Sequence, residues 1–411
     1  MKITELKKTA SPGMVCVSAR IDWEDSDRGT ADLFFSTTDE YVDEFLCNPH
    51  AFLTVAVPLA MRYGEKRLAI DSNICPELRA GLEDIMEMFS LWSAGKLQPV
   101  KIEAGSLIQN TQTKSTRTGL YLSGGVDSMF SLRRNRLDYS ENYPGYIKDC
   151  VFVHGADIGG MDRPDQRLEF YERYRSALEP LAQEMGVNII PIYTNARRID
   201  HNNDFWLYQY HGAVLGGIAH TLSSRIGNMY IASTYDVKNM KPFGSHPLVD
   251  PRFGSADLRI YHDGLRFSRL EKTRLVSEWP TGMKNLRVCT GSEGPLNCGR
   301  CEKCIRTKTA LLAIGVLDEA ESFRDKEVTV DLLSTIELQF DYQRSCYEDV
   351  IAPLEERGYL ELASYIKKMI KRYYTVKKIK DVDNKLLRGS LAKMNRLRHR
   401  ILTNNSMALE T

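Results

Sequence analysis

Short runs of apolar and β-branched residues alternate with longer amphipathic segments through the first quarter of the chain. The strand-like runs are MVCVSARI, ADLFFSTT, RLAID and QPVKIEA. Two longer segments, VDEFLCNPHAFLTVAVPLAM and LRAGLEDIMEMFSLWSAG, have the apolar spacing of helices. The pattern predicts a small α+β domain over residues 1–108.

A second pattern begins after QNTQTKSTRTG, a polar run over residues 109–119 that is typical of a linker. From there the apolar runs GLYLSG, CVFVHGA, NIIPIYT and NMYIAST each precede a helical segment. Strands alternating with crossover helices predict an α/β fold over residues 120–315, with a doubly wound parallel sheet whose ligands bind beyond the carboxyl ends of the strands. Residues 235–268 have the composition of a loop, and residues 316–411 predict a mostly helical extension.

Composition and charge narrow the class of protein. The 411 residues are 43% hydrophobic and 27% charged, which excludes a largely disordered chain. The longest apolar stretch, residues 52–61, is too short for a membrane span, and the N-terminal residues show no apolar export signal. We therefore expect a cytoplasmic protein without membrane association, in which the nine cysteines are thiols or metal ligands rather than disulfides.

Charge is distributed unevenly along the chain. Residues 357–411 carry a net charge of +10, and the residues before them carry −9. The basic tail is compatible with nucleic-acid binding, but packing of its apolar face onto the acidic remainder or onto a partner explains the same composition. Packing is the favoured interpretation, because the whole chain has no basic excess. The N-terminal domain and the tail are candidate surfaces for a protein partner, and a homodimer is a further expectation.

A glycine loop lies at the end of the first strand of the parallel sheet. Residues 123–128 read SGGVDS, and adjacent glycines allow successive backbone N–H groups to converge on an anion at a helix N-terminus. The hydroxyls of Ser123 and Ser128 are donors for phosphate oxygens. Asp127 faces a polyanion favourably only through Mg²⁺, so we assign it to magnesium. An ordinary strand-to-helix turn is the simpler alternative.

SGGVDS resembles the pyrophosphate loop of the PP-loop ATP pyrophosphatases. These enzymes adenylate a substrate oxygen with release of pyrophosphate, and a nitrogen or sulfur nucleophile then displaces AMP. The resemblance covers residues 120–315 and implies that ATP is bound by the loop. The residues that it assigns to nucleotide binding are Ser123, Gly124, Gly125, Val126, Asp127 and Ser128, with Asp127 and Ser128 also assigned to catalysis.

Four cysteines form a cluster near the end of the α/β segment. Cys289, Cys298, Cys301 and Cys304 follow the spacing C-x8-C-x2-C-x2-C. Four soft thiolates within sixteen residues suit a tetrahedral Zn²⁺, and a filled coordination sphere indicates a structural ion. An iron–sulfur cluster is the weaker alternative.

The glycine loop together with this cysteine spacing is similar to the 7-cyano-7-deazaguanine synthase family, which forms a nitrile. Arg306 follows the last cysteine as an arginine does in that family, and Lys272 corresponds loosely to a lysine before its zinc segment, which implies a catalytic role. The N-terminal domain and the helical extension depart from the family pattern, which favours a relative with a different acceptor. Such relatives also occur in bacterial antiphage defence operons.

Four further residues are candidates by position. Asp157 follows the second strand of the parallel sheet, and Asn195 and Arg197 follow the third, so all three are expected to face a bound nucleotide. For Asp157 a helix cap is an equally good explanation, and for Arg197 an exposed salt bridge. His246 lies in the polar loop and is a candidate general base, although a lone histidine is more often structural.

These features favour an ATP-dependent ligase that adenylates a small-molecule carboxylate or amide carbonyl and transfers it to ammonia or an amine. Its cofactors would be ATP, Mg²⁺ and Zn²⁺. Thiolation of a nucleobase or tRNA is the enzymatic alternative. A QueC-like defence component that modifies a protein or nucleic acid, a nucleic-acid-binding module and an ATP sensor remain as further interpretations.

Overall fold

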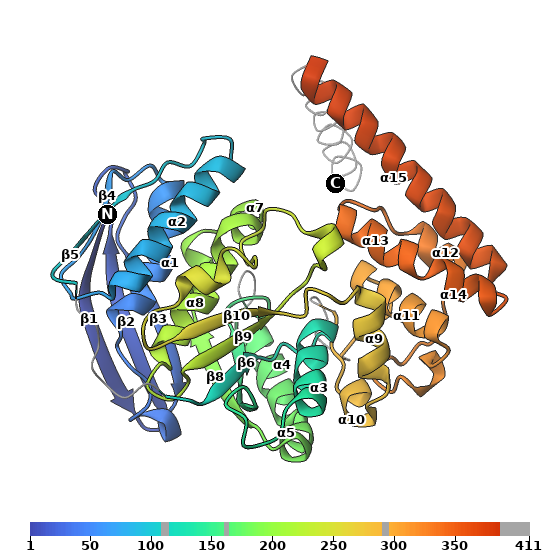
Figure 1. Ribbon diagram of the computed structural model, residues 1–411, viewed down its shortest axis with the longest axis horizontal. Helices are drawn as coiled ribbons and strands as arrows, with labels where there is room; N and C mark the ends of the chain where they lie inside the picture. The colour runs from blue at the N-terminus through green and yellow to red at the C-terminus, as the bar shows by residue number, and fades with distance from the viewer. Residues whose placement is uncertain (108–114, 160–163, 290–295, 387–411) are drawn as a thin grey trace, which may run out of the picture. The chain divides into compact units, whose positions relative to one another are not determined.

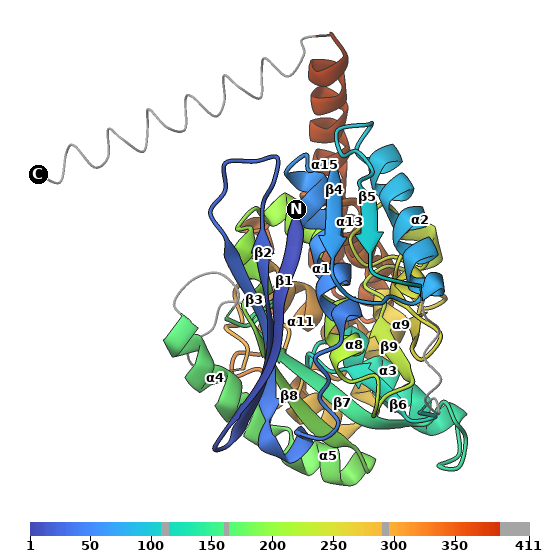
Figure 2. The ribbon, with the colours of Figure 1, turned by 90° about the vertical axis from the view of Figure 1, so that its left-hand side faces the viewer.

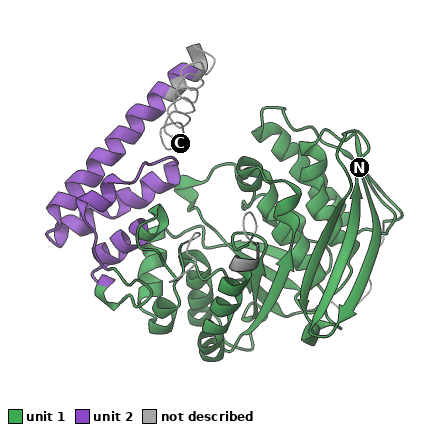
Figure 3. Ribbon diagram, turned by 180° about the vertical axis from the view of Figure 1, so that it is seen from behind, with its two compact units in different colours: residues 1–304, 318–325 green, residues 305–317, 326–411 purple. Residues whose placement is uncertain are grey.

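The computed structural model describes residues 1–107, 115–159, 164–289 and 296–386 (Figure 1). Two compact units divide the chain. Unit 1 comprises residues 1–304 and 318–325, and unit 2 comprises residues 305–317 and 326–411 (Figure 3). The predicted linker at 109–119 therefore falls inside unit 1. Residues 109–114 of it lie outside the described residues, and its last two residues belong to a strand.

Unit 1 contains all of the strands in the described residues. The strands are β1 (Lys2–Ser11), β2 (Met14–Asp22), β3 (Ala31–Thr38), β4 (Arg67–Ile70), β5 (Lys101–Ala104), β6 (Thr118–Tyr121), β7 (Ile147–His154), β8 (Asn188–Thr194), β9 (Asn228–Ala232) and β10 (Arg259–Asp263).

The α-helices follow the strands and then continue into unit 2. They are α1 (Pro49–Arg62), α2 (Pro76–Trp92), α3 (Val126–Asp138), α4 (Pro164–Ala177), α5 (Glu179–Met185), α6 (Ala196–Ile199), α7 (Asn203–Phe205), α8 (His211–Thr221), α9 (Arg269–Ser277), α10 (Pro280–Lys284), α11 (Glu302–Ile314), α12 (Val330–Ser334), α13 (Asp341–Asp349), α14 (Ile351–Glu356) and α15 (Leu360–Leu386). Short 3₁₀ and π segments are η1 (Asp39–Tyr41), η2 (Trp206–Tyr210), η3 (Val237–Asn239), η4 (Asp250–Phe253) and η5 (Leu317–Glu319).

The ten strands form one sheet in the order β10-β9-β6-β7-β8-β3-β2-β1-β4-β5, seen from the side in Figure 2. Strands β6 to β10 pair in parallel, as the alternation of strands and helices predicts. The pairs β1–β2, β2–β3 and β3–β8 are antiparallel, while β4 pairs in parallel with β1 and β5. The α/β class with a large, mostly parallel sheet is confirmed.

The N-terminal segment is continuous with the parallel sheet rather than separated from it. Strand β3 pairs with β8 through Phe35 and Ser36, and Thr37 donates from Oγ1 to the carbonyl of Pro191 at 2.7 Å. Two strands also differ from the sequence pattern. The polar strand β1 was not expected, and β10 lies inside the region predicted to be a loop.

Helices cover both faces of the parallel half. Neighbouring residues of β7 show this, because Val151 lies in the main apolar core whereas the ring of Phe152 stacks on Tyr171 of α4 at 4.5 Å. On the core side α1 packs on α8. The helical segment that follows β7 is divided into α4 and α5, with α5 beginning at Glu179.

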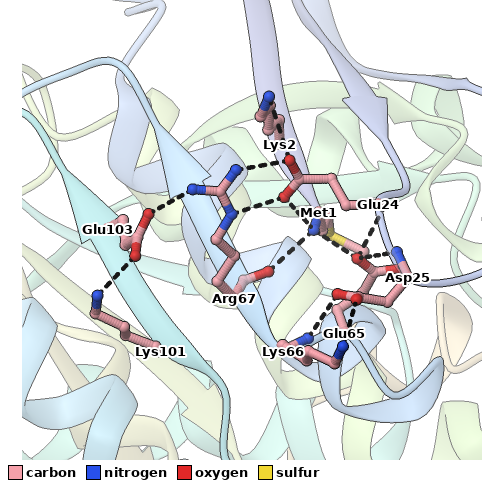
Figure 4. A network of polar contacts seen from close by, with 9 residues as sticks. All are labelled: Met1, Lys2, Glu24, Asp25, Glu65, Lys66, Arg67, Lys101 and Glu103. Atoms are coloured by element: carbon pink, nitrogen blue, oxygen red, sulfur yellow. Dashed lines mark hydrogen bonds and ion pairs between the residues drawn. The ribbon is translucent and has the colours of Figure 1, made fainter.

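A network of ion pairs and hydrogen bonds connects β1, β4 and β5 in the N-terminal half of the sheet (Figure 4). The α-amino group of Met1 donates to the Glu65 carboxylate at 2.5 Å and to the Arg67 carbonyl at 3.0 Å. Glu65 is buried and also accepts from the backbone N–H of Glu24 at 3.0 Å. Arg67 pairs with Glu24 and with Glu103 at 2.8 Å each. Each carboxylate of this network faces a cation or a backbone N–H.

Unit 2 is helical, as predicted for the extension. Helices α12, α13 and α14 each contact the long helix α15. The guanidinium of Arg357 donates to the Ala313 carbonyl at 3.0 Å, and Lys377 pairs with Asp341 at 2.9 Å. Residues 387–411, which hold much of the basic tail, lie outside the described residues.

Across the described ranges, none of the helices combines the length and the apolar character that a bilayer crossing requires.

Candidate functional site

The glycine loop connects β6 to α3 at the carboxyl edge of the parallel strands. Gly124 has φ +76°, and a Cβ there would lie 1.7 Å from the Tyr174 hydroxyl oxygen, so only glycine fits. Gly125 is the N-cap of α3, and the buried Val126 begins the helix. The strand, turn and helix that the motif requires are all present.

The two loop serines bond to one another. The Ser123 and Ser128 hydroxyl oxygens are 3.2 Å apart, and the Ser128 hydroxyl also bonds the Gly125 carbonyl at 3.1 Å. The Ser123 hydroxyl accepts from the Gly125 N–H at 3.2 Å. Ser128 is buried, so it stabilises the loop from behind, while Ser123 remains exposed beside the glycines.

The carboxylate of Asp127 is paired with two cationic side chains. Its carboxylate pairs with Arg269 at 2.5 Å and with Lys272 at 3.4 Å, both on α9. Burial acts to raise the pKa of Asp127, but Arg269 and Lys272 together outweigh it and lower the pKa. The carboxylate is therefore ionised near neutral pH, at the first turn of the helix that follows the glycine loop.

Lys272 is held on two sides. It is buried, and its ammonium donates to the Ser233 carbonyl beyond β9 at 2.6 Å as well as approaching Asp127. Helix α9 begins with a capping box formed by Ser268 and Glu271, which fixes the first turn that carries Arg269. Lys272 was suggested only by a loose correspondence to a lysine of the resembled family. In the structure it lies next to the glycine loop.

Asp157 lies in the loop beyond β7, at the same edge of the sheet. Its side chain is 64% exposed and approaches Arg197 at 3.6 Å. The surrounding protein acts to raise the pKa of Asp157, but Lys303, Arg197, His211 and Arg287 counteract this effect and lower it. An exposed carboxylate among cations at this position is available to a ligand.

The two candidates after β8 have structural partners. Arg197 donates to the Ala156 carbonyl at 3.0 Å and lies over the Trp206 ring at 4.7 Å, so it supports the loop that carries Asp157. Asn195 accepts from the Phe34 N–H at 3.0 Å and donates to the Asp32 carbonyl at 2.6 Å. Both ends of the Asn195 carboxamide bind β3, so this side chain fixes β8 to β3, and only its second N–H and its second oxygen lone pair are left for a nucleotide.

His246 belongs to a separate cluster with Asp250 and His262. The buried Asp250 carboxylate bonds His262 Nδ1 at 2.6 Å, and the Leu248 N–H donates to His246 Nδ1 at 3.1 Å. Burial lowers the pKa of His246, with a smaller contribution from His262. Its ring packs against Trp92, an arrangement that accounts for this histidine structurally.

The four predicted metal ligands converge. The Sγ atoms of Cys289, Cys298, Cys301 and Cys304 all lie within 4.8 Å of one another, with Cys301–Cys304 at 3.4 Å and Cys289–Cys301 at 3.9 Å. A tetrahedral ion with metal–sulfur bonds of about 2.3 Å places its sulfurs roughly 3.8 Å apart. The donor set and its spacing therefore fit a zinc ion.

Three cations of the site were not predicted from the sequence. Arg269 pairs with Asp127, Arg287 donates to the Ser123 carbonyl at 3.0 Å, and Lys303 lowers the pKa of Asp157. Arg269 is one helical turn from Lys272 at i and i+3, a spacing that could have indicated it. Arg287 and Lys303 reach the site through the tertiary fold, which no local pattern indicates.

No family model, curated protein or solved structure matches this chain. The assignment of a function therefore depends on the residues of the site.

Proposed function

We propose that the protein is an ATP-dependent ligase that adenylates a carboxylate or amide carbonyl and then forms a carbon–nitrogen bond. The observation that carries this proposal is the glycine loop of residues 123–125 with the charged group Asp127, Arg269 and Lys272 beside it. Backbone N–H groups at a helix N-terminus next to two cations favour a polyphosphate ligand.

The proposed reaction has two steps. A substrate oxygen attacks the α-phosphorus of ATP, the bond to the β-phosphate oxygen breaks, and pyrophosphate leaves. The nitrogen of ammonia or an amine then attacks the activated carbon, AMP leaves with the former substrate oxygen, and the nitrogen loses a proton to solvent or a basic group. An amide results from a carboxylate. When an amide oxygen is adenylated in the same way, no second nitrogen attacks: the amide nitrogen loses its two protons, the C–O bond breaks, AMP leaves, and a nitrile results.

The cations stabilise the leaving group in this scheme. Arg269 and Lys272 compensate the charge of Asp127 in the free protein, and a bound triphosphate offers them further oxygens. Lys272 retains its bond to Ser233 while its remaining N–H donors are directed to phosphate. Because Lys272 is buried, its charge acts with little screening by water.

Mg²⁺ would be held by Asp127 together with the phosphate oxygens. Magnesium sites in nucleotide-dependent enzymes use one or two carboxylates and complete the shell with phosphate and water, so a single carboxylate is sufficient. When bound, the ion would neutralise charge on the leaving pyrophosphate. The exposed carboxylate of Asp157 is the proposed acceptor for a hydroxyl of the nucleotide or the substrate.

Zinc at the cysteine cluster is proposed as a structural ion. Four thiolates would fill its coordination sphere and leave no position for substrate. The hydrogen bond to Cys289 contributes most to raising the pKa of Cys301 to about 11, so its thiol is protonated in the metal-free protein. Metal binding must displace such protons.

The cysteine on the parallel strands does not favour thiolation. Cys150 lies on β7 and is fully buried, and burial raises its pKa to about 12. A protonated, inaccessible thiol cannot act as a sulfur carrier.

The proposal is tested by measuring pyrophosphate and AMP from ATP in the presence of a panel of carboxylates that includes 7-carboxy-7-deazaguanine, with ammonia or an amine present. We expect both products, and their formation should require the carboxylate and magnesium. Asp84→Ala, which removes an exposed carboxylate on α2, is the matched control for Asp127→Ala. Formation of ADP and orthophosphate instead would refute the proposed chemistry.

A further inference from the structure

The segment from Asn285 to Cys289 links the glycine loop to the cysteine cluster. It runs from the end of α10 to the first cysteine, and its polar backbone groups bond in two directions. On one side the Arg287 N–H donates to the Gly124 carbonyl at 2.8 Å, and the Arg287 guanidinium donates to the Ser123 carbonyl at 3.0 Å. Two successive carbonyls of the glycine loop are thus held by one residue.

Holding these carbonyls orients the groups that would bind phosphate. In a trans peptide the C=O and the next N–H point in opposite directions, and the described residues contain no cis peptide. Fixing the Ser123 carbonyl on Arg287 turns the Gly124 N–H away from Arg287, and fixing the Gly124 carbonyl does the same for the Gly125 N–H. Arg287 therefore sets the direction of both peptide planes of the anion-binding turn.

The arginine is itself held by aromatic rings. Its guanidinium carbon lies 5.6 Å from the ring centroid of Tyr174 and 5.7 Å from that of Phe170. The Tyr174 hydroxyl donates to the Asn285 carbonyl at 2.7 Å and occupies the space beneath Gly124. The glycine loop and the linking segment thus share the same support.

On its other side the segment is held by Asn297. This buried residue accepts at Oδ1 from the N–H groups of Val288 and Cys289, at 2.8 and 3.2 Å. Its Nδ2 donates to the Leu286 carbonyl at 2.8 Å and to the Ser322 carbonyl at 3.1 Å. Asn297 directly precedes Cys298, so one carboxamide joins the two chain segments that supply the first two sulfurs.

We propose that Arg287 and Asn297 are positioning residues that couple the cysteine cluster to the glycine loop, so that a metal ion at the cluster and phosphate at the loop favour each other's binding. The phosphate-binding part of this inference rests on the proposed function. Loss of the metal frees Cys289 and Cys298, loosens the segment that Asn297 holds, and allows the two peptide planes to turn. By reciprocity, phosphate bound to the loop must raise the affinity of the cluster for the metal. Because bound phosphate also holds the linking segment in place, we expect metal release to become slower.

The experiment uses the zinc-loaded full chain and follows zinc transfer to an excess of a chromophoric chelator, with and without ATP. We expect ATP to slow release by about fivefold or more, a coupling of ordinary size. Inorganic pyrophosphate should act in the same direction, because the linkage runs through the phosphates. Arg287→Ala removes the bond to the Ser123 carbonyl but keeps the backbone bond to Gly124, so the ATP effect should shrink, and Arg287→Lys, which retains one donor for Ser123, should restore part of it.

Two controls keep the outcomes separate. Arg252→Ala removes an arginine that is 56% exposed and should leave the ATP effect unchanged. A protein-free mixture of zinc and chelator at the same ATP concentration corrects for zinc binding by ATP itself. Asn297→Asp retains the acceptor but loses both donors, and it should speed zinc release and shrink the ATP effect. Circular dichroism verifies that each variant is folded.

Equilibrium dialysis with labelled ATP distinguishes the two proposals. If zinc-loaded protein binds ATP but releases zinc at the same rate with and without it, the coupling is refuted and the proposed function stands. If zinc-loaded protein does not bind ATP, the proposed function fails and the coupling fails with it.

Discussion

Two groups of charged residues, one in each half of the ten-stranded sheet, differ in how far they are open to a ligand. In the N-terminal half, Met1, Glu65 and Arg67 pair with one another and with their neighbours, so the charges form a closed network (Figure 4). At the carboxyl edge of the parallel half, Asp127 faces two cations and Asp157 stays 64% exposed. A closed network serves the fold, whereas charges with an open side can serve a ligand.

Strand direction explains this difference. Strands β1 to β3 alternate in direction, so the residues that follow them are distributed between two edges. Strands β6 to β10 run in parallel, so the residues after each strand meet at the same edge. The comparison predicts that substitutions in the N-terminal network lower mainly the stability, whereas substitutions at the carboxyl edge of the parallel strands lower mainly the activity.

The largest effect is expected at the cysteine cluster. Cys298→Ser or Cys301→Ser should reduce bound zinc from one per chain to none and unfold the segment around it, because binding of a structural zinc contributes about 10 kcal/mol or more to folding. Elemental analysis and hydrogen exchange measure this, with exchange in β1–β4 unchanged. Cys16→Ser, on β2, is the control. Iron in place of zinc would contradict the structural-zinc assignment.

A second large effect is expected for Asp127→Asn. Loss of the carboxylate removes the proposed magnesium ligand and the partner of Arg269 and Lys272, so the proposed ATP turnover should fall by a factor of about a hundred or more. The urea midpoint should also fall, because the buried ammonium of Lys272 loses its carboxylate partner and keeps only its bond to the Ser233 carbonyl, so turnover is compared per folded molecule. Turnover equal to that of the unaltered protein would remove Asp127 from the mechanism.

The converse result is expected for Glu65→Ala. This change leaves the Met1 amino group without its buried partner, and breaking a buried pair typically costs about 3–5 kcal/mol. Urea unfolding should show the loss, while turnover per folded molecule stays constant. Glu83→Ala, which removes an exposed partner of Arg79, should leave both quantities unchanged. A lower turnover per folded molecule in Glu65→Ala would contradict the expectation that this network acts on stability alone.

The smallest effect concerns acid stability. The hydrogen bond from Arg67 is the main reason why the pKa of Glu24 is lowered from 4.5 to about 2. A lowered pKa in the folded state stabilises the fold above pH 4.5, and this contribution disappears as the pH falls toward 2. Urea midpoints between pH 6 and 3 should therefore fall less in Glu24→Gln, by a small amount because Arg67 is 41% exposed.

Local patterns predicted the parts of the site that depend on sequence neighbours. The glycine loop was expected from adjacent glycines after an apolar strand, and the cysteine spacing indicated four converging sulfurs, both of which the geometry bears out. Lys272 was suggested by a loose correspondence and lies next to Asp127. Whether these residues bind ATP and zinc stays a prediction.

Long-range pairing could not be predicted. Strand β1 is mostly exposed and polar, so its sequence lacks the alternation of a half-buried strand. The five residues of β10 lie among loop-forming Gly, Pro and Asp, and only pairing with β9 makes them a strand. The partners of Asn195 lie on β3, more than 150 residues away in sequence, which is why a nucleotide contact was the simpler expectation.

The antiparallel pairing of β3 with β8 also has a consequence for the solubility of fragments. Without residues 1–107, β8 would end the parallel sheet with a free row of backbone donors and acceptors, and the Pro191 and Thr194 groups that bond β3 would lose their partners. A bare strand edge recruits other chains and drives aggregation. The N-terminal strands thus act as an intramolecular cap, and a shortened chain that begins at residue 115 should aggregate even though it retains every residue of the glycine loop and the cysteine cluster.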